Sequence, residues 1–242
     1  KNGLPTRLMA FSAANAETGA TADLEKLSLL AEKYRIPLLI DGVALLGKKN
    51  FSFLPGISAM AFSAHKIHGP KGAGFLILRR HLPCHAQISG GPQEYQKRAG
   101  TENLSGILGM AEAVAIALKN QDRKIKKMQF LRDLFEAELQ AQLTIQINGP
   151  QNRLCNLSNL AFEGILAEDL LIRLDQKAVF ASHGSACSAK AFKVSRVLLN
   201  MGYEPKRAAS SIRFSLSKLT TKTEILKAVK IIVQLCRKLK AG

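Results

Sequence analysis

Residues 57–78 read ISAMAFSAHKIHGPKGAGFLIL, in which two apolar runs flank a loop of polar and small residues. The runs Ile57–Ser63 and Gly74–Leu78 have the length and composition of short buried strands. The loop places the hydroxyl of Ser63, the imidazole of His65 and the amine of Lys66 directly after the first run. Hydroxyl, imidazole and free backbone N–H groups suit a phosphate, and a lysine amine among other cations becomes nucleophilic. A surface turn is equally compatible with these residue types.

The sequence before and after this stretch alternates helical and strand patterns. Leucines at helical spacing follow Thr21, the expected N-cap, and the apolar run Ile36–Ile40 predicts another strand. Residues Thr101–Leu118 predict an apolar helix. Strands that alternate with helices indicate an α/β architecture with a largely parallel sheet. Asp41 directly follows a strand, so we expect its carboxylate at the carboxyl edge of the sheet, where ligands bind, although a structural role is equally compatible.

The second half of the chain has a different pattern. Two long charged helices are expected at Lys119–Leu143 and Lys222–Lys240, and short strands and helices lie between them. The second helix opens with Thr221 and Glu224 at the spacing of a capping box. We therefore expect one domain over residues 1–118 and a smaller α+β domain over residues 119–242.

The net charge of the 242-residue chain is +17, from 35 Lys and Arg against 18 Asp and Glu. Residues 119–242 carry +12 of it, mostly on the two expected helices. Two Lys-rich surface helices explain this excess, and a polyanionic partner is the alternative. The absence of zinc-finger spacing, of an aromatic RNA-binding motif and of a block of consecutive basic residues argues against nucleic acid.

Several further classes of protein are disfavoured by the sequence. No apolar run approaches the roughly 20 residues that a membrane span needs, and the first residues do not have a signal-peptide pattern. Four widely spaced cysteines (84, 155, 187 and 236) do not form a disulfide framework, so we expect a cytoplasmic protein. His81, Cys84 and His85 could ligate zinc, but Pro83 prevents a regular helix from presenting them together, and no metal site is expected.

Four motifs, in order and at matching spacing, carry a family resemblance. Their sequences are SAHKIHGPKG at 63–72, GGPQE at 90–94 with RAGTEN at 98–103, SHGSACS at 182–188 and SIRFS at 211–215. They resemble the cofactor-lysine, Gly-Gly, active-cysteine and substrate-binding segments of the NifS/IscS-like cysteine desulfurases, in the class V aminotransferase family. The resemblance implies the later part of a fold-type I pyridoxal-phosphate (PLP)-dependent transferase large domain, plus a smaller α+β C-terminal domain. It also implies that the N-terminal part of the family's sequence is lacking.

The same resemblance implies roles for the cofactor-binding residues. Lys66 would bind pyridoxal 5'-phosphate covalently, and Asp41 would pair with the ring nitrogen. Ser63 and His65 would hold the phosphate. Thr101 would contact the phosphate of the neighbouring subunit, which implies a homodimer.

Two further residues would act on the substrate, L-cysteine. Arg213 would bind the substrate carboxylate, a role suited to a planar bidentate donor. Cys187 would be the catalytic nucleophile that takes the sulfur as a persulfide, and L-alanine would be released. Cys236 is expected to be an inert buried thiol, because it lies on the apolar face of its helix, and Cys84 and Cys155 have no assigned role.

Two positions depart from the family pattern. Ala16 stands where the family usually has the second Asn of an Asn-Asn-Glu run, and Ala44 stands where it has a Gln. Each loss would remove one polar contact to the cofactor, worth about 1 kcal/mol. A shift of one residue could bring Asn15 into reach, although the spacing does not favour it.

The resemblance therefore implies an enzyme that supplies persulfide sulfur for iron–sulfur cluster or thio-cofactor assembly. We expect the 242 residues alone to be inactive, and we expect the basic surface of residues 119–242 to attract an acidic sulfur-acceptor protein. A diverged or inactive homologue that acts as a binding or scaffold protein is the main alternative. A related lyase or aminotransferase is less compatible with Cys187.

Overall fold

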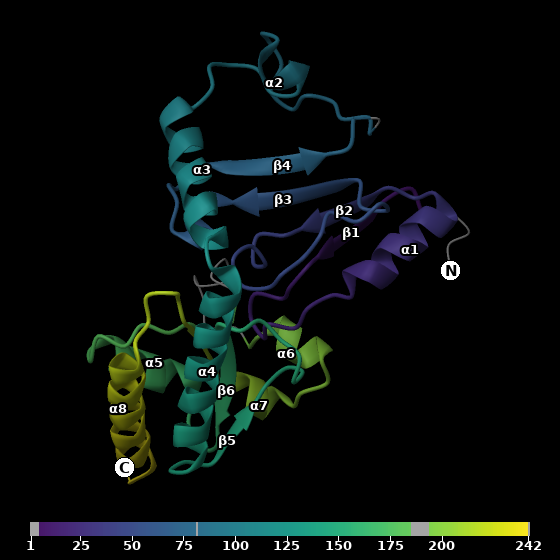
Figure 1. Cartoon of the computed structure of the whole chain (residues 1–242). Coiled ribbons are helices and arrows are strands. Elements are labelled where there is room, and N and C mark those ends of the chain that lie inside the picture. Colours follow the sequence, from purple (N-terminus) through teal and green to yellow (C-terminus); the bar gives the residue numbers. More distant parts are fainter. Residues whose placement is uncertain (1–4, 81, 185–193, 242) are drawn as a thin grey trace. The chain divides into compact units, whose positions relative to one another are not determined.

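The computed structural model of the chain describes residues 5–80, 82–184 and 194–241. It divides into two compact units (Figure 1). The first comprises Lys1–Ala14 and Ala22–Gln121, and the second comprises Asn15–Thr21 and Asp122–Gly242. The short segment Asn15–Thr21 thus belongs with residues that follow it by more than a hundred positions, which the sequence pattern did not indicate. The assignment of cofactor binding to 1–118 and of the cysteine loop to 119–242 stays a prediction.

The first unit contains a four-stranded sheet in the order of the sequence. Its strands are β1 (Met9–Ser12), β2 (Leu38–Asp41), β3 (Ala59–Ser63) and β4 (Gly74–Leu78). The first three are parallel, and β4 is antiparallel to β3. This agrees with the expected largely parallel sheet.

The alternation of side chains along the strands separates an apolar face from a functional one. Leu38, Ile40 and Met60 are fully buried on one face. The register pairs Ser12 with Asp41 and Asp41 with Ala61. Because successive side chains point to opposite faces, Ser12, Asp41 and Ser63 lie on the other face, at the carboxyl ends of their strands.

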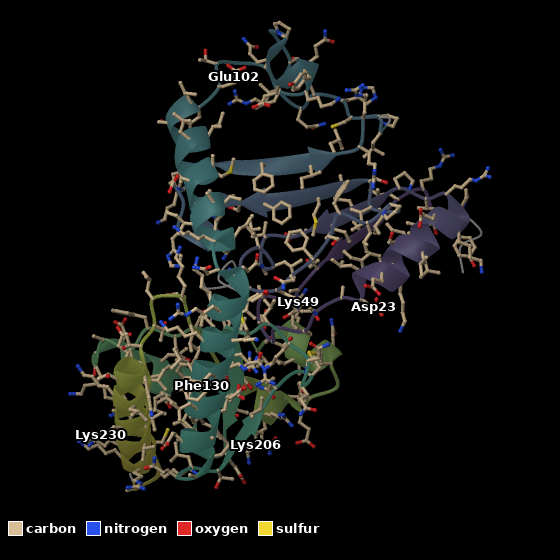
Figure 2. All side chains as sticks on the ribbon, in the orientation of Figure 1. Asp23, Lys49, Glu102, Phe130, Lys206 and Lys230 are labelled. Carbon is tan, nitrogen blue, oxygen red and sulfur yellow. The ribbon has the colours of Figure 1, made fainter. Side chains whose placement is uncertain are left out.

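The helices of the first unit begin at residues whose side chains bind free backbone N–H groups. Helix α1 (Leu24–Tyr34) is capped by Asp23, which accepts a hydrogen bond from the Lys26 N–H at 3.0 Å (Figure 2). The expected cap, Thr21, was wrong, because the carboxylate two residues later is at the capping position. Helix α3 (Leu104–Leu118) begins after Asn103 rather than at Thr101, because the Asn103 side chain accepts from Gly106 N–H at 3.1 Å. The short α2 (Gln93–Gln96) lies between them in sequence.

The second unit is α+β, as the sequence predicted. An antiparallel sheet has the order β5 (Ile145–Ile147), β6 (Leu157–Phe162) and β7 (Ser211–Ser215). Its helices are α4 (Gln121–Gln140), α5 (Ala167–Asp175), α6 (Arg196–Asn200), α7 (Pro205–Ala209) and α8 (Lys222–Ala241). Within the part of the chain that the structure describes, no helix has both the length and the apolarity to cross a membrane.

Helix α8 supplies one wall of the second unit's core. Its predicted capping box is confirmed: Thr221 N–H donates to Glu224 Oε2 at 2.8 Å, and Glu224 N–H donates to Thr221 Oγ1 at 3.2 Å. The buried side chains of α8 pack with those of α4, α5, β6 and β7; those on α8 are Ile225, Val229, Ile232, Val233, Leu235 and Cys236. Basic side chains such as Lys230 project outward (Figure 2).

Cys236 is fully buried in this core, as predicted, and burial raises the pKa of its thiol from 9.0 to about 12. The unfolded chain therefore releases the thiol proton at a lower pH than the folded protein does. We expect the Cys236 contribution to stability to be constant below pH 9. Between pH 9 and pH 12 it should fall with a limiting slope of about 1.4 kcal/mol per pH unit.

Urea unfolding of the wild type and of Cys236→Ala over this pH range measures that contribution. The alanine variant loses some stability at every pH, but its pH dependence should be shallower than that of the wild type above pH 9. Parallel curves for the two proteins would contradict the prediction.

Candidate active site

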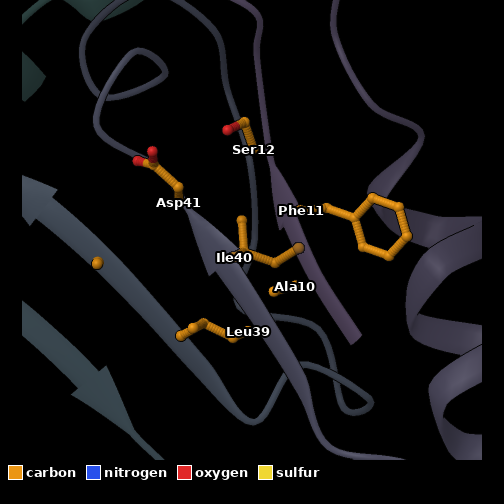
Figure 3. Close-up of a pocket in the computed structure, with 7 residues that line it drawn as sticks. Ala10, Phe11, Ser12, Leu39, Ile40 and Asp41 are labelled. Atoms are coloured by element: carbon orange, nitrogen blue, oxygen red, sulfur yellow. The ribbon is translucent and has the colours of Figure 1, made fainter. Parts of the chain in front are cut away.

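The carboxyl ends of β1, β2 and β3 form a groove of about 250 Å³. Figure 3 shows Ser12 and Asp41 at the ends of neighbouring strands, with the apolar side chains of Leu39 and Ile40 below them and the ring of Phe11 to one side. The other lining residues are Ala10, Phe11, Leu39, Ile40 and Ala61. The groove therefore combines an apolar floor with a hydroxyl and a carboxylate at one end.

Asp41 is held at this edge by its own backbone and by the following turn. Its carbonyl accepts a hydrogen bond from Ala13 N–H at 2.8 Å, and its Oδ1 accepts one from Val43 N–H at 2.9 Å. The residue is nevertheless exposed. Asp41 thus has a defined orientation while it stays accessible to a ligand.

The end of β3 leads directly into the lysine-bearing turn. Ser63 Oγ and His65 Nδ1 lie 2.7 Å apart, at hydrogen-bond distance. Lys66 is exposed on the 3-10 helix η1 (Ala64–Ile67), and its carbonyl accepts a hydrogen bond from Lys48 Nζ at 3.0 Å. The structure therefore brings together Ser63, His65 and Lys66 as the sequence predicted, with Asp41 on the adjacent strand.

Gly69 allows this turn to close against helix α3. Its N–H donates to the Ala64 carbonyl at 2.9 Å. A Cβ atom at Gly69 would lie 3.0 Å from that carbonyl oxygen and 3.1 Å from the Cβ of Ala113. Glycine is favoured here because a side chain would force the lysine-bearing turn or the helix behind it to give way by a few tenths of an ångström.

The residues at this edge fit pyridoxal phosphate. A hydroxyl and an imidazole lie within hydrogen-bond distance of each other after a strand end, which suits a phosphate group. An exposed amine follows one residue later, and an exposed carboxylate at the next strand end suits a protonated ring nitrogen. Every group that the family resemblance requires of Asp41, Ser63, His65 and Lys66 is present at one edge of the sheet.

Thr101 lies in a separate segment that is ordered by Arg98. The Arg98 Nη1 donates to the carbonyls of Gly100 and Thr101, at 3.0 and 3.1 Å. Gly100 N–H in turn donates to Gln93 Oε1 at 3.2 Å. Within the described ranges, no hydrogen bond joins Thr101 to the Lys66 turn. The role of Thr101 toward a neighbouring subunit stays a prediction.

Arg213 lies on β7 of the second unit. Its backbone pairs with Ser182 through hydrogen bonds of 2.7 and 3.1 Å, and its Nη1 donates to the Ala16 carbonyl at 3.0 Å. Burial lowers the pKa of the guanidinium, and the carboxylate of Glu17 partly opposes that shift. The predicted carboxylate-binding residue is thus a half-buried cation that is fixed by the Asn15–Thr21 segment.

Cys187 falls within residues 185–193, which lie outside the described residues. The preceding His183 is described, and its Nδ1 lies 2.8 Å from the Ser211 carbonyl. Cys84 is exposed and Cys155 is buried. No cluster of three or more His, Cys, Asp or Glu side chains with metal-binding geometry occurs among residues 5–80, 82–184 and 194–241.

The segment Asn15–Thr21 contains a residue that the sequence prediction did not assign. Asn15 Oδ1 accepts hydrogen bonds from the N–H groups of Glu17 and Thr18, at 2.9 and 3.0 Å, so this oxygen is engaged in its own turn. Glu17 is only 5% exposed and accepts a hydrogen bond from Ser195. The sequence could have pointed to Glu17, because it corresponds to the Glu of the family's Asn-Asn-Glu run. Its burial, however, follows only from the fold.

Comparisons with known proteins extend these observations. The sequence profile described as "Aminotransferase class-V" matches residues 4–227. A cysteine desulfurase IscS from Dictyoglomus turgidum is 37% identical over 239 residues, and a cysteine desulfurase from Sinorhizobium fredii is 35% identical over 230. These alignments cover 97% and 94% of the chain, and 60% and 59% of the relatives. The chain therefore spans about three fifths of the length of these relatives.

Solved structures give the same result. A NifS-like protein superposes with a TM-score of 0.88 at 30% identity, over 96% of this chain and 62% of that one. A NifS-like protein from Rickettsia africae ESF-5 has a TM-score of 0.85 at 27% identity, over 97% and 62%. The predicted fold class, part of a fold-type I transferase with a smaller α+β domain, is confirmed.

The hydrogen bonds of Arg98 give a prediction for the Thr101 segment. Arg98→Ala should increase the exchange rate of the Gly100 amide proton about fivefold, because the guanidinium that bridges two carbonyls of this loop is lost. Hydrogen exchange followed by NMR measures this rate. Lys97→Ala, at the neighbouring exposed position, should leave it unchanged; equal rates in the wild type and in Arg98→Ala would contradict the prediction.

Proposed function

This chain belongs to the class-V aminotransferase family, and from that premise we propose that it serves as a PLP-dependent cysteine desulfurase, which converts L-cysteine to L-alanine. The observation that carries the proposal is the arrangement at one sheet edge: Lys66 follows the Ser63–His65 pair at the end of β3, and Asp41 ends the adjacent strand. Relatives named cysteine desulfurase support the choice among class-V activities. Because the chain spans about 60% of them, we expect the 242 residues by themselves to be inactive.

The first unit supplies the groups that bind the cofactor. Pyridoxal phosphate, when bound, supplies an electron sink for the substrate's carbon atoms. The carboxylate of Asp41 keeps the ring nitrogen protonated, and Ser63 and His65 hold the phosphate. The amine of Lys66 would hold the cofactor and would carry protons to and from the substrate's carbon atoms.

The second unit supplies the groups that act on L-cysteine. Arg213 binds the substrate carboxylate, since a planar guanidinium donates two parallel hydrogen bonds to it. The thiolate of Cys187 attacks the sulfur of the substrate. A new S–S bond forms as the substrate C–S bond breaks, the electron pair of that bond stays with the carbon, and a proton completes L-alanine. Cys187 then carries the sulfur as a persulfide for iron–sulfur cluster or thio-cofactor assembly.

Two variants of the complete protein separate cofactor binding from sulfur transfer. Lys66→Ala should not attach pyridoxal phosphate covalently, whereas Cys187→Ser should retain it; each should lower L-alanine formation at least 100-fold. Cofactor absorbance and L-alanine release measure the two steps, and Lys71→Ala is the matched lysine control. A complete wild-type protein that neither attaches the cofactor nor forms L-alanine would contradict the proposed activity.

A protein that neither attaches the cofactor nor forms L-alanine is what the alternative function predicts, in which the chain is a diverged homologue that acts as a scaffold. Ala16 and Ala44 cannot supply the polar contacts that the family places there. The Oδ1 of Asn15 is engaged by the N–H groups of Glu17 and Thr18. The alternative predicts a folded dimer that does not turn over L-cysteine.

The surface of helix α3 supports a homodimer in either case. Its buried side contains Gly106, Met110, Ala113 and Ala117. Large apolar side chains on the remainder of the helix are exposed, namely Leu104, Ile107, Leu108, Ile116 and Leu118. A helix that is apolar on all sides is typical of a buried position. Thr101, three residues before α3, would then lie at the subunit interface.

The beginning of α4 carries Lys124, Lys126 and Lys127, and the segment before α8 carries Lys218; these four lysines are called the basic cluster. The Lys127 Nζ donates to the Lys218 carbonyl at 3.0 Å. Partial burial, followed by the charge of Lys124, lowers the pKa of the Lys218 amine. We propose that this cluster attracts an acidic sulfur-acceptor protein in the cytoplasm.

Reversal of the charges at Lys124, Lys126 and Lys127 to Glu tests the cluster. Persulfide transfer to the acceptor should slow about tenfold at low salt, while L-alanine formation stays unchanged, because steering affects encounter and not chemistry. The matched control reverses Lys230, Lys238 and Lys240, at the far part of α8. If transfer and L-alanine formation decrease together, the cluster does not serve the acceptor.

A further inference from the structure

The segment Asn15–Thr21 is attached to the second unit through a buried glutamate. Glu17 is 5% exposed, and burial of a carboxylate is costly unless it is hydrogen-bonded. Ser195 Oγ donates to Glu17 Oε2, and Asn159 Nδ2 donates to the Glu17 carbonyl at 3.0 Å. The side chain and the main chain of Glu17 are thus bound at the same time, by two elements of the second unit.

Both partners of Glu17 are themselves fixed. Ser195 caps helix α6, where its Oγ accepts a hydrogen bond from Leu198 N–H at 3.2 Å. Asn159 lies at the centre of β6 and pairs in register with Arg213 of β7. Its Oδ1 accepts a hydrogen bond from Asn148 Nδ2 at 2.8 Å. The position of Glu17 is therefore determined by a rigid sheet and a capped helix.

Arg213 depends on the residue directly before Glu17. Its Nη1 donates to the Ala16 carbonyl at 3.0 Å, and its buried Nε has no hydrogen-bond partner among the described residues. The structure contains no direct ion pair between Glu17 and Arg213, although the carboxylate favours the charged guanidinium. The guanidinium therefore contacts the main chain directly before Glu17 rather than the carboxylate itself.

The turn itself does not require a buried charge. Asn15 Oδ1 already binds the N–H groups of Glu17 and Thr18, and Asn15 N–H donates to the Ala20 carbonyl at 2.7 Å. These bonds close the turn without the Glu17 side chain. The carboxylate adds an attachment to Ser195, at the residue directly after the Ala16 carbonyl to which Arg213 donates.

We propose that Glu17 is a positioning residue for Arg213: its side chain, bound by Ser195, holds the Ala16 carbonyl so that the guanidinium presents its remaining N–H groups to the substrate carboxylate. The proposal rests on the proposed function, since it takes Arg213 as the carboxylate-binding residue. It predicts that loss of the Glu17 side chain weakens binding of the substrate's carboxylate group and leaves binding of the rest of the substrate unchanged.

The test compares two ligands that differ only in that group, L-alanine and L-alaninamide. Their dissociation constants are measured with the complete, cofactor-loaded protein, by the change in cofactor absorbance. The wild type should prefer L-alanine, and Arg213→Ala should abolish the preference. Glu17→Ala should lower the preference about tenfold and raise the KM for L-cysteine by a similar factor, with less than a threefold change in kcat. Glu163→Ala, an exposed glutamate of the same unit, is the control.

Glu17→Gln and a double variant distinguish positioning from other roles. A glutamine still accepts the Ser195 hydrogen bond, so Glu17→Gln should stay within about threefold of the wild type. Glu17→Ala should have no further effect when Arg213 is already alanine. If Glu17→Ala does not fold, Ser195→Ala carries the test and should lower the preference in the same direction.

Three results would overturn the proposal. They are equal weakening of both ligands by Glu17→Ala, additive effects of Glu17→Ala and Arg213→Ala, and a Glu17→Gln variant as impaired as Glu17→Ala. A wild type with no preference for L-alanine and no L-alanine formation would instead overturn the proposed function, and this inference with it.

Discussion

The parallel register of β1, β2 and β3 is the constraint on which the candidate site depends. Parallel strands end at the same edge of a sheet. The register therefore places Ser12 beside Asp41, which is 29 positions away in the sequence, and Asp41 beside Ala61, which is 20 positions away. The period of two then directs Ser12, Asp41 and Ser63 to one face. A shift of one residue in β2 would turn Asp41 to the face on which Met60 is buried, and would turn Leu38 and Ile40 to the face of Ser12 and Ser63.

The second unit is organised by buried polar groups beside an apolar core. Glu136 accepts hydrogen bonds from Arg153 on both carboxylate oxygens, at 2.6 Å, and from Ser158 at 2.7 Å. Glu17 is bound by Ser195 in a similar manner. A buried charge is tolerated only when it has such hydrogen-bond partners, and these hydrogen bonds form in only a few relative positions of the two groups. These contacts therefore fix the position of segments, including the one that supports Arg213, whereas the apolar cluster around α8 supplies most of the stabilising burial.

Local patterns predicted β2, β3, β4, α3, α4 and α8 to within a few residues, whereas β1 and most elements between α4 and α8 were given no bounds. Gly74–Leu78 is β4 without change, and the capping box placed the beginning of α8. The start of α1 was misplaced because Thr21 and Asp23 both have side chains that cap helices, and only the path of the chain decides between them. The membership of Asn15–Thr21 in the second unit was not predictable from periodicity, because its bonds to Asn159, Ser195 and Arg213 join residues 142 to 197 positions apart.

The sequence by itself determined the family, the fold class and the identity of the chemical groups, because motifs and hydrophobic periodicity are local properties of the chain. It also located Lys66 beside Ser63 and His65, since three residues in one turn cannot separate. Only the tertiary structure decided that Asp41 stays exposed at the neighbouring strand end, that the Asn15 Oδ1 is engaged in its own turn, and that Glu17 is buried against Ser195. Burial and long-range hydrogen bonds depend on which distant segments meet, and that follows from packing rather than from local sequence.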